Sequence, residues 1–158
     1  MSIEVFPVGY VHSSRRDRSD DGWDEVESYI ELTEDFSTET LVGLEEFSHV
    51  LVVFSMHEVD KGSIVTGSRR PRNRGDLPRA GIFAQRGSGR PNRLGVTVSR
   101  LIKIEDTRLY LRGLDAIDGT PVLDLKPWMI EFGPRGEVHQ PEWVSNLMKH
   151  YWRKAEES

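Results

Sequence analysis

One glycine- and arginine-rich stretch, Gly81–Gly95, carries residue types that could bind a ligand. Its glycines at 87, 89 and 95 let the backbone approach a bound molecule closely. The side chains able to take part are Arg86, Arg90, Asn92 and Arg93. Arginine offers forked donors for phosphate or carboxylate, and the asparagine amide can pair with a base edge. Gly87-Ser88-Gly89 matches half of a dinucleotide fingerprint, but a strand follows where that fingerprint needs a helix. The alternative interpretation is an arginine-rich hairpin.

A second stretch, Leu114–Trp128, combines a tight turn with several charges. Asp118-Gly119 is a turn signal, and Pro121 fixes the exit of the chain. Three aspartates and a lysine accompany the turn, at Asp115, Asp118, Asp124 and Lys126. Carboxylates at the ends of a turn suit ribose hydroxyls or an ammonium group. The alternative is a type I turn with no ligand.

Several other chemistries lack the residues that they need. The chain has no cysteine and no HExxH pattern, and a regular strand would hold His49 and His57 about 26 Å apart, so we expect no metal site. A Gly-x-Ser-x-Gly elbow for acyl transfer is also missing.

The charge of the chain is unevenly distributed. The net charge is −5, which disfavours a nonspecific nucleic-acid binder. However, eight arginines, no lysine and one acid (Asp76) lie between Arg69 and Arg93, whereas acids concentrate near the start. This polarity indicates a surface for phosphate or carboxylate, with a solvated basic loop as the alternative.

Short strands must position these residues. The expected strands are Phe6–His12, Glu25–Leu32, Val50–Met56, Gly81–Ala84, Val96–Glu105, Thr107–Leu114 and Pro121–Leu125. The nearly continuous apolar run Val50–Met56 predicts a strand buried on both faces. Alternation in Val96–Glu105 predicts that Val96, Val98, Ile102 and Ile104 point inward.

Two helices complete the expected structure. Thr38–Phe47 reads as one helix with Thr38 as its cap, and Pro141–Lys154 has apolar residues at helical spacing. Val59–Pro78 is a long segment without periodicity. Many short strands without regular strand–helix alternation predict a mainly β protein. We expect a small closed antiparallel β-barrel with peripheral helices. It would form one domain over residues 1–158, with the barrel at about 4–130 and a C-terminal helix at about 141–154.

No apolar run approaches the roughly 20 residues that span a bilayer. The first residues lack the basic and apolar regions of a secretion signal. We therefore expect no membrane partner and a cytoplasmic location.

The sequence resembles the TrmO family, also called the YaeB-, VirR- or TsaA-like family, from about Phe6 to Trp128. The motifs that carry the resemblance are Pro7–Ser13, Leu44–His49, Phe54–His57, Gly81–Arg86, Arg90–Gly95 and Asp118–Trp128. Their joint order is specific, although each alone is weak. The resemblance implies a small β-barrel, a homodimer, and an S-adenosylmethionine-dependent methyltransferase that acts on threonylcarbamoyl-modified adenosine beside the anticodon of tRNA.

The resemblance also implies site residues. Cofactor-binding positions are Met56, His57, Arg86, Val96, Ile117, Asp118, Gly119 and Thr120. Nearer the substrate lie Arg90, Asn92 and Lys126. His57 is the candidate general base, because an imidazole suits proton transfer near neutral pH. The C-terminal helix with Trp143 and Trp152 is the expected dimer surface.

One motif departs from the family. Members carry a Pro-Arg-Gln stretch after the first strand, where this chain has approximately Asp21-Gly22-Trp23-Asp24. Carboxylates thus replace a cation, which favours a smaller or different methyl acceptor. Two other classes therefore stay open: a barrel that binds S-adenosylmethionine without a tRNA substrate, either as a small-molecule methyltransferase or as a sensor, and a barrel that docks an acidic protein.

Overall fold

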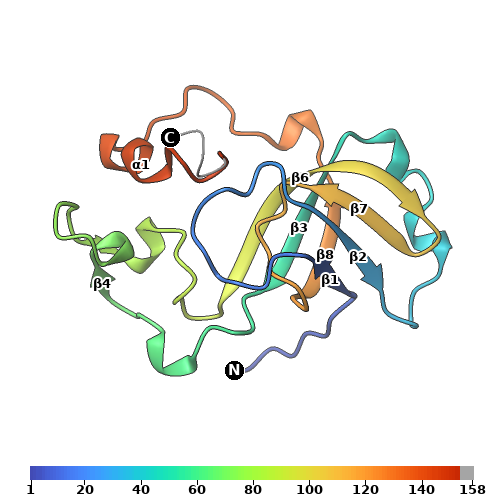
Figure 1. Ribbon diagram of the computed structural model, residues 1–158, viewed down its shortest axis with the longest axis horizontal. Coiled ribbons are helices and arrows are strands. Elements are labelled where there is room, and N and C mark those ends of the chain that lie inside the picture. The colour runs from blue at the N-terminus through green and yellow to red at the C-terminus, as the bar shows by residue number, and fades with distance from the viewer. Residues whose placement is uncertain (154–158) are drawn as a thin grey trace.

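A computed structural model describes residues 1–153, and its main feature is a closed barrel of six antiparallel strands (Figure 1). The barrel strands are β1 (Gly9–Ser13), β2 (Glu27–Leu32), β3 (His49–Ser55), β6 (Leu94–Glu105), β7 (Arg108–Arg112) and β8 (Pro121–Pro127). They neighbour one another in the order β1-β2-β7-β6-β3-β8. The predicted closed antiparallel barrel is confirmed.

Smaller elements surround the barrel. A separate two-stranded ladder joins β4 (Ser68–Arg69) to β5 (Ala80–Gly81), and α1 (Glu142–Met148) lies near the C-terminus (Figure 1). Six 3₁₀ turns span Thr38–Leu41, Leu44–Glu46, Lys61–Ser63, Pro71–Asn73, Ile82–Ala84 and Ile130–Phe132. Within residues 1–153, no helix has the length and apolar character needed to span a bilayer.

Alternate residues of each strand fill the barrel. Inward-facing side chains that are fully buried include Val11, Ile30, Val50, Val52, Leu109, Leu111 and Val122. On β3 only every second residue is buried, so the prediction of a strand buried on both faces is wrong. The physical reason is that a single closed barrel has one interior, and the outer face of β3 is only partly covered.

The predicted orientation of the sixth strand is also wrong. Thr97 and Ser99 are the buried residues of β6, whereas Val96, Val98 and Ile102 are 40, 39 and 47% exposed. A register shift between Leu101 and Lys103 returns Ile104 to the edge of the core. Apolar alternation misled the prediction because β6 places polar side chains inside and apolar side chains outside.

The predicted helix Thr38–Phe47 and strand Gly81–Ala84 are wrong as well. Two 3₁₀ turns replace the helix because Gly43 has a positive φ of 87° between them, and Ser37 provides the N-terminal cap. Only Ala80–Gly81 pairs as a strand, and the chain then turns. The remaining predicted strands are confirmed with ends moved by up to three residues.

The C-terminal helix is confirmed but shorter than predicted, ending at Met148, and the predicted last residue Lys154 lies outside the described residues. After the helix, the chain folds back onto the segment that follows β1. The amide of Trp23 donates to the carbonyl of Tyr151 at 3.0 Å, and the amide of Asp24 donates to that of Trp152 at 2.9 Å. The C-terminal segment is thereby fixed to the barrel.

Candidate functional site

Arg86 connects the first glycine-rich stretch to the barrel wall. Its Nη2 donates to the carbonyl of Val96 on β6 at 2.7 Å. Two sequence-predicted cofactor residues are therefore in direct contact. The rest of the exposed Arg86 guanidinium forms no ion pair within residues 1–153.

The other arginines of this stretch shape the loop itself. Arg90 donates to the carbonyl of Gln85 at 2.8 Å, and Arg93 donates to the carbonyl of Val59 at 2.8 Å. Both side chains bind backbone oxygens, so their positive charge is not neutralised. Arg90 is predicted to lie near the substrate, and in the structure it is half-buried and hydrogen-bonded to backbone carbonyls of its own loop.

The second stretch forms a tight turn against the end of β1. Gly119 adopts a positive φ of 81°, and its amide donates to the carbonyl of Val11 at 2.8 Å. The Asp118 carboxylate accepts from the amide of Ser13 at 3.0 Å. The hydroxyl of the buried Thr120 donates to the carbonyl of Ile117 at 2.7 Å. These bonds fix the turn Ile117–Thr120 at one end of the barrel.

Met56 and His57 lie between the two stretches. The amide of Met56 donates to the carbonyl of Arg93 at 2.8 Å, which attaches it to the first stretch. A Cβ placed on Gly119 would lie 3.9 Å from Nε2 of the exposed His57, so the imidazole is next to the turn of the second stretch. The structure therefore brings together predicted cofactor residues from three separate parts of the chain.

Two predicted substrate residues lie outside this group. Asn92 is exposed at the loop surface and has no hydrogen bond from its side chain to any described residue. Lys126 is six residues beyond Thr120, or about 20 Å along a strand, and pairs with Asp124 at 3.4 Å. Lys126 is therefore far from the turn.

Asp115 is a site feature that sequence reasoning did not distinguish. Its carboxylate accepts hydrogen bonds from the hydroxyls of Thr97 and Tyr151, which are 18 and 36 residues away in the chain. Burial raises the pKa of the Tyr151 phenol, and the neighbouring Asp115 raises it further, while Arg86 and Arg72 act in the opposite direction. Only the folded chain brings these groups together, so no sequence spacing could reveal them.

The acidic segment after β1 is held by cations. Arg15 lies with its guanidinium carbon 3.5 Å from the ring centre of the buried Trp23, and it donates to the carbonyls of Asp21 and Gly22 at 2.9 Å each. Burial lowers the pKa of Arg15. Arg72 pairs with the Asp21 carboxylate at 3.1 Å. The acidic charge of this segment is thus partly compensated.

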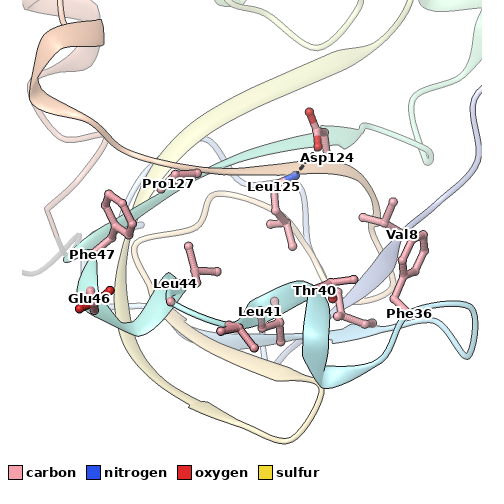
Figure 2. A pocket seen from close by; sticks show the side chains of 13 residues that line it. Val8, Phe36, Thr40, Leu41, Leu44, Glu46, Phe47, Asp124, Leu125 and Pro127 are labelled. Carbon is pink, nitrogen blue, oxygen red and sulfur yellow. Dashed lines mark hydrogen bonds between the residues drawn. The ribbon is translucent and has the colours of Figure 1, made fainter.

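An apolar cavity lies on another part of the barrel. This hollow has a volume of about 480 Å³ and lies between the 3₁₀ turns Thr38–Glu46 and the later half of β8. Figure 2 shows the side chains that line it. Leu41, Leu44, Leu125 and Phe36 line it, and its only charged lining residues are Glu46 and Asp124. Its lining residues include none of Met56, His57, Arg86 or the turn Ile117–Thr120. Without a cation, it does not match the predicted site. In residues 1–153, no group of three or more potential ligands could hold a metal.

The comparisons with known proteins agree with this fold. The family model of the tRNA-methyltransferase O N-terminal domain matches residues 11–133. A human tRNA (adenine(37)-N6)-methyltransferase is 40% identical over 111 residues, covering 70% of this chain and 25% of that protein. A probable S-adenosyl-L-methionine-binding protein of Pyrococcus abyssi is 33% identical over 138 residues, covering 84% of this chain and 71% of its own length.

A solved structure of TrmO from Pseudomonas aeruginosa superimposes with a TM-score of 0.72 at 32% identity. The superposition covers 88% of this chain and 61% of the TrmO chain. The chain thus spans a quarter of the human relative and about three fifths of the bacterial structure. The fold is shared, the family model spans most of the chain, and the chain belongs to the tRNA-methyltransferase O N-terminal domain family.

Proposed function

We propose that this protein is an S-adenosylmethionine-dependent methyltransferase that methylates the adenine N6 of threonylcarbamoyl-modified adenosine in tRNA. The supporting observation is the meeting of Arg86 and Val96, Met56 and His57, and the turn Ile117–Thr120 at one end of the barrel. The names of the relatives, which include a tRNA (adenine(37)-N6)-methyltransferase and an S-adenosyl-L-methionine-binding protein, support the same activity.

The residues present fit the proposed cofactor. S-adenosylmethionine has a carboxylate, an ammonium, ribose hydroxyls and an adenine, and when bound it supplies a methyl group on a cationic sulfur. Arg86 offers the forked cation that suits the carboxylate. The Gly119 turn offers backbone groups and the Asp118 carboxylate to hydroxyls. Met56 and Val96 supply apolar surface beside them.

His57 is the proposed general base. Methylation of an exocyclic nitrogen requires that nitrogen to lose a proton, and His57 is exposed beside the turn, where a substrate could reach it. Most of the rate increase would come from holding the two reactants in line. Proton transfer by one positioned side chain contributes about 10²- to 10⁴-fold.

The arginine cluster supports an RNA substrate. Of the eight arginines from Arg69 to Arg93, only Arg72 and Arg74 pair with carboxylates of described residues. Arg70, Arg79, Arg86, Arg90 and Arg93 donate to backbone carbonyls, which leaves their charge available to phosphates. We assign Arg90, Asn92 and Lys126 to the RNA-binding surface, Lys126 at its far side. Action on tRNA would place this protein in the cytoplasm.

A methyl-transfer assay tests this function. Labelled S-adenosylmethionine is incubated with tRNA that carries or lacks the threonylcarbamoyl mark, using the wild type and His57→Ala. We expect label only in marked tRNA, and a large loss of turnover in the variant. Binding of tRNA should weaken steeply with salt. Tight cofactor binding without label in any RNA would contradict the tRNA substrate. Unchanged turnover in His57→Ala would contradict its role as base.

We also propose a homodimer that covers the outer face of β6. Leu94, Val98 and Ile102 are exposed apolar residues on this face, at 42, 39 and 47%, in addition to Val96 of the cofactor site. Trp152, which is 43% exposed, lines the same small hollow as Val98, so the C-terminal segment extends this set of residues. The ion pair of Arg100 with Asp24 stands between Val98 and Ile102 on this face. Exposed apolar side chains gathered on one strand face nevertheless favour an interaction site.

A further inference from the structure

The three aspartates of the second stretch, Leu114–Trp128, have different partners. Asp118 accepts from the amide of Ser13 and lies 4.0 Å from Arg16, and Asp124 accepts from the amide of Leu125 and pairs with Lys126. Asp115 has no cation within 4.0 Å among residues 1–153. It is the aspartate of this stretch whose negative charge lacks a counterion.

Asp115 is nevertheless firmly held. The hydroxyl of Thr97 donates to one carboxylate oxygen and the hydroxyl of Tyr151 donates to the other. Thr97 is buried inside the barrel, and Tyr151 is fixed through its carbonyl, which accepts from the amides of Gly22 and Trp23 at 2.8 and 3.0 Å. Two neutral donors orient the carboxylate without neutralising it.

Asp115 is linked to Arg86 through two consecutive residues of β6. Arg86 donates to the carbonyl of Val96, and the next residue, Thr97, donates to Asp115. Arg86 and Asp115, neither of which forms an ion pair within residues 1–153, are therefore bound to consecutive residues of β6. A partly buried charge without a partner is unfavourable, so a ligand that supplies the missing charge is stabilised there.

This opposite pair matches a zwitterionic amino acid. We propose that Asp115 binds the ammonium group of the amino-acid end of S-adenosylmethionine, while Arg86 binds its carboxylate. Thr97 and Tyr151 are positioning residues that act through Asp115. The inference rests on the proposed cofactor site and adds to it the residue that selects for the amino-acid end. Tyr151 lies outside residues 11–133, so the C-terminal segment contributes to this selection.

Two probes separate this role from a general structural role. S-adenosylmethionine carries the amino-acid end, and 5′-methylthioadenosine has the same nucleoside thioether without it. Calorimetry with Asp115→Asn should show binding of S-adenosylmethionine weakened roughly tenfold to a hundredfold, the loss of a hydrogen bond to a charged group. Binding of 5′-methylthioadenosine should be unchanged, which also reports that the variant is folded.

Matched variants sharpen the result. Tyr151→Phe removes only the hydroxyl. It should weaken the binding of S-adenosylmethionine but not of 5′-methylthioadenosine, and by less than Asp115→Asn does. Thr97→Ser keeps a donor and should bind like the wild type. Glu105→Gln removes an acid at the distant β6–β7 turn and should leave both probes unaffected.

The outcomes distinguish this inference from the proposed function. Equal weakening of both probes in Asp115→Asn, or no weakening of either, would overturn the role of Asp115 while the cofactor assignment stands. If the wild type does not bind S-adenosylmethionine, the proposed function fails and this inference fails with it.

Discussion

The guanidinium of Arg86 lies 2.7 Å from the carbonyl oxygen of Val96, and this contact joins the arginine-rich loop to the wall of the barrel. Val96 follows Gly95, the last residue of the loop motif, so the bond closes the loop onto its own end. One guanidinium nitrogen orients the side chain, and the others form no hydrogen bond within residues 1–153, so a ligand can bind them. The relation explains how an exposed arginine can be both ordered and available.

Arg86→Lys tests this double role. Lysine keeps the charge but lacks the fork, so it cannot hold the Val96 carbonyl and grip a carboxylate in one plane. We expect the affinity for S-adenosylmethionine to fall about tenfold, measured by calorimetry. Arg79→Lys is the control, because the hydrogen bonds of Arg79 with described residues go to Ser68. Equal affinities of the wild type and Arg86→Lys would contradict the assignment.

Gly95→Ala should destabilise the barrel. A Cβ at Gly95 would lie 2.4 Å from two atoms of the Phe54 ring, which is buried in the core. The overpacking should lower the free energy of unfolding by about 1 to 3 kcal/mol, measured by urea denaturation. Gly81→Ala provides the comparison, since nothing lies within 4 Å of its added Cβ. If both variants lost the same stability, the Phe54 contact would not be the cause.

Tyr151→Phe should change how stability depends on alkaline pH. The pKa of Tyr151 is raised in the folded state by burial and by Asp115, whereas a tyrosine in an unfolded chain ionises near about 10. The unfolded state therefore loses a proton first, and the contribution of the phenol to stability is complete below about pH 10 and declines above it. We expect the free energy of unfolding to fall more steeply above pH 10 in the wild type than in Tyr151→Phe. Parallel curves would show that the phenol is not buried against Asp115 in solution.

Ile102→Lys tests the proposed dimer surface. Ile102 is 47% exposed on the outer face of β6, six residues beyond Val96, or about 20 Å along a strand. A lysine in an apolar interface without a partner is unfavourable, so the variant should be monomeric by light scattering while the wild type is dimeric. Val42→Lys is a control, because Val42 is exposed elsewhere, at 74%. A wild-type monomer would rule out the dimer, and a dimeric Ile102→Lys would place its interface elsewhere.

The sequence by itself determined the fold class and the position of most strands. Period-two alternation and turn residues follow from local geometry, which is why β2 and the turn at Asp118-Gly119 were predictable. The same local rules failed at β6, where Thr97 faces inward toward Asp115. They also failed at Thr38–Phe47, where Gly43 interrupts the helix.

The tertiary structure alone decided which charges meet. The resemblance proposed Arg86, His57 and the turn Ile117–Thr120 from separate motifs, but sequence spacing does not state that Met56 contacts Arg93 or that Gly119 lies by His57. Asp115 became distinct from Asp118 and Asp124 only when their partners were known. The physical reason is that Asp115 bonds to Thr97, 18 residues away, and to Tyr151, 36 residues away. The first bond depends on strand register and the second on the docking of the C-terminal segment, and no local sequence pattern encodes either.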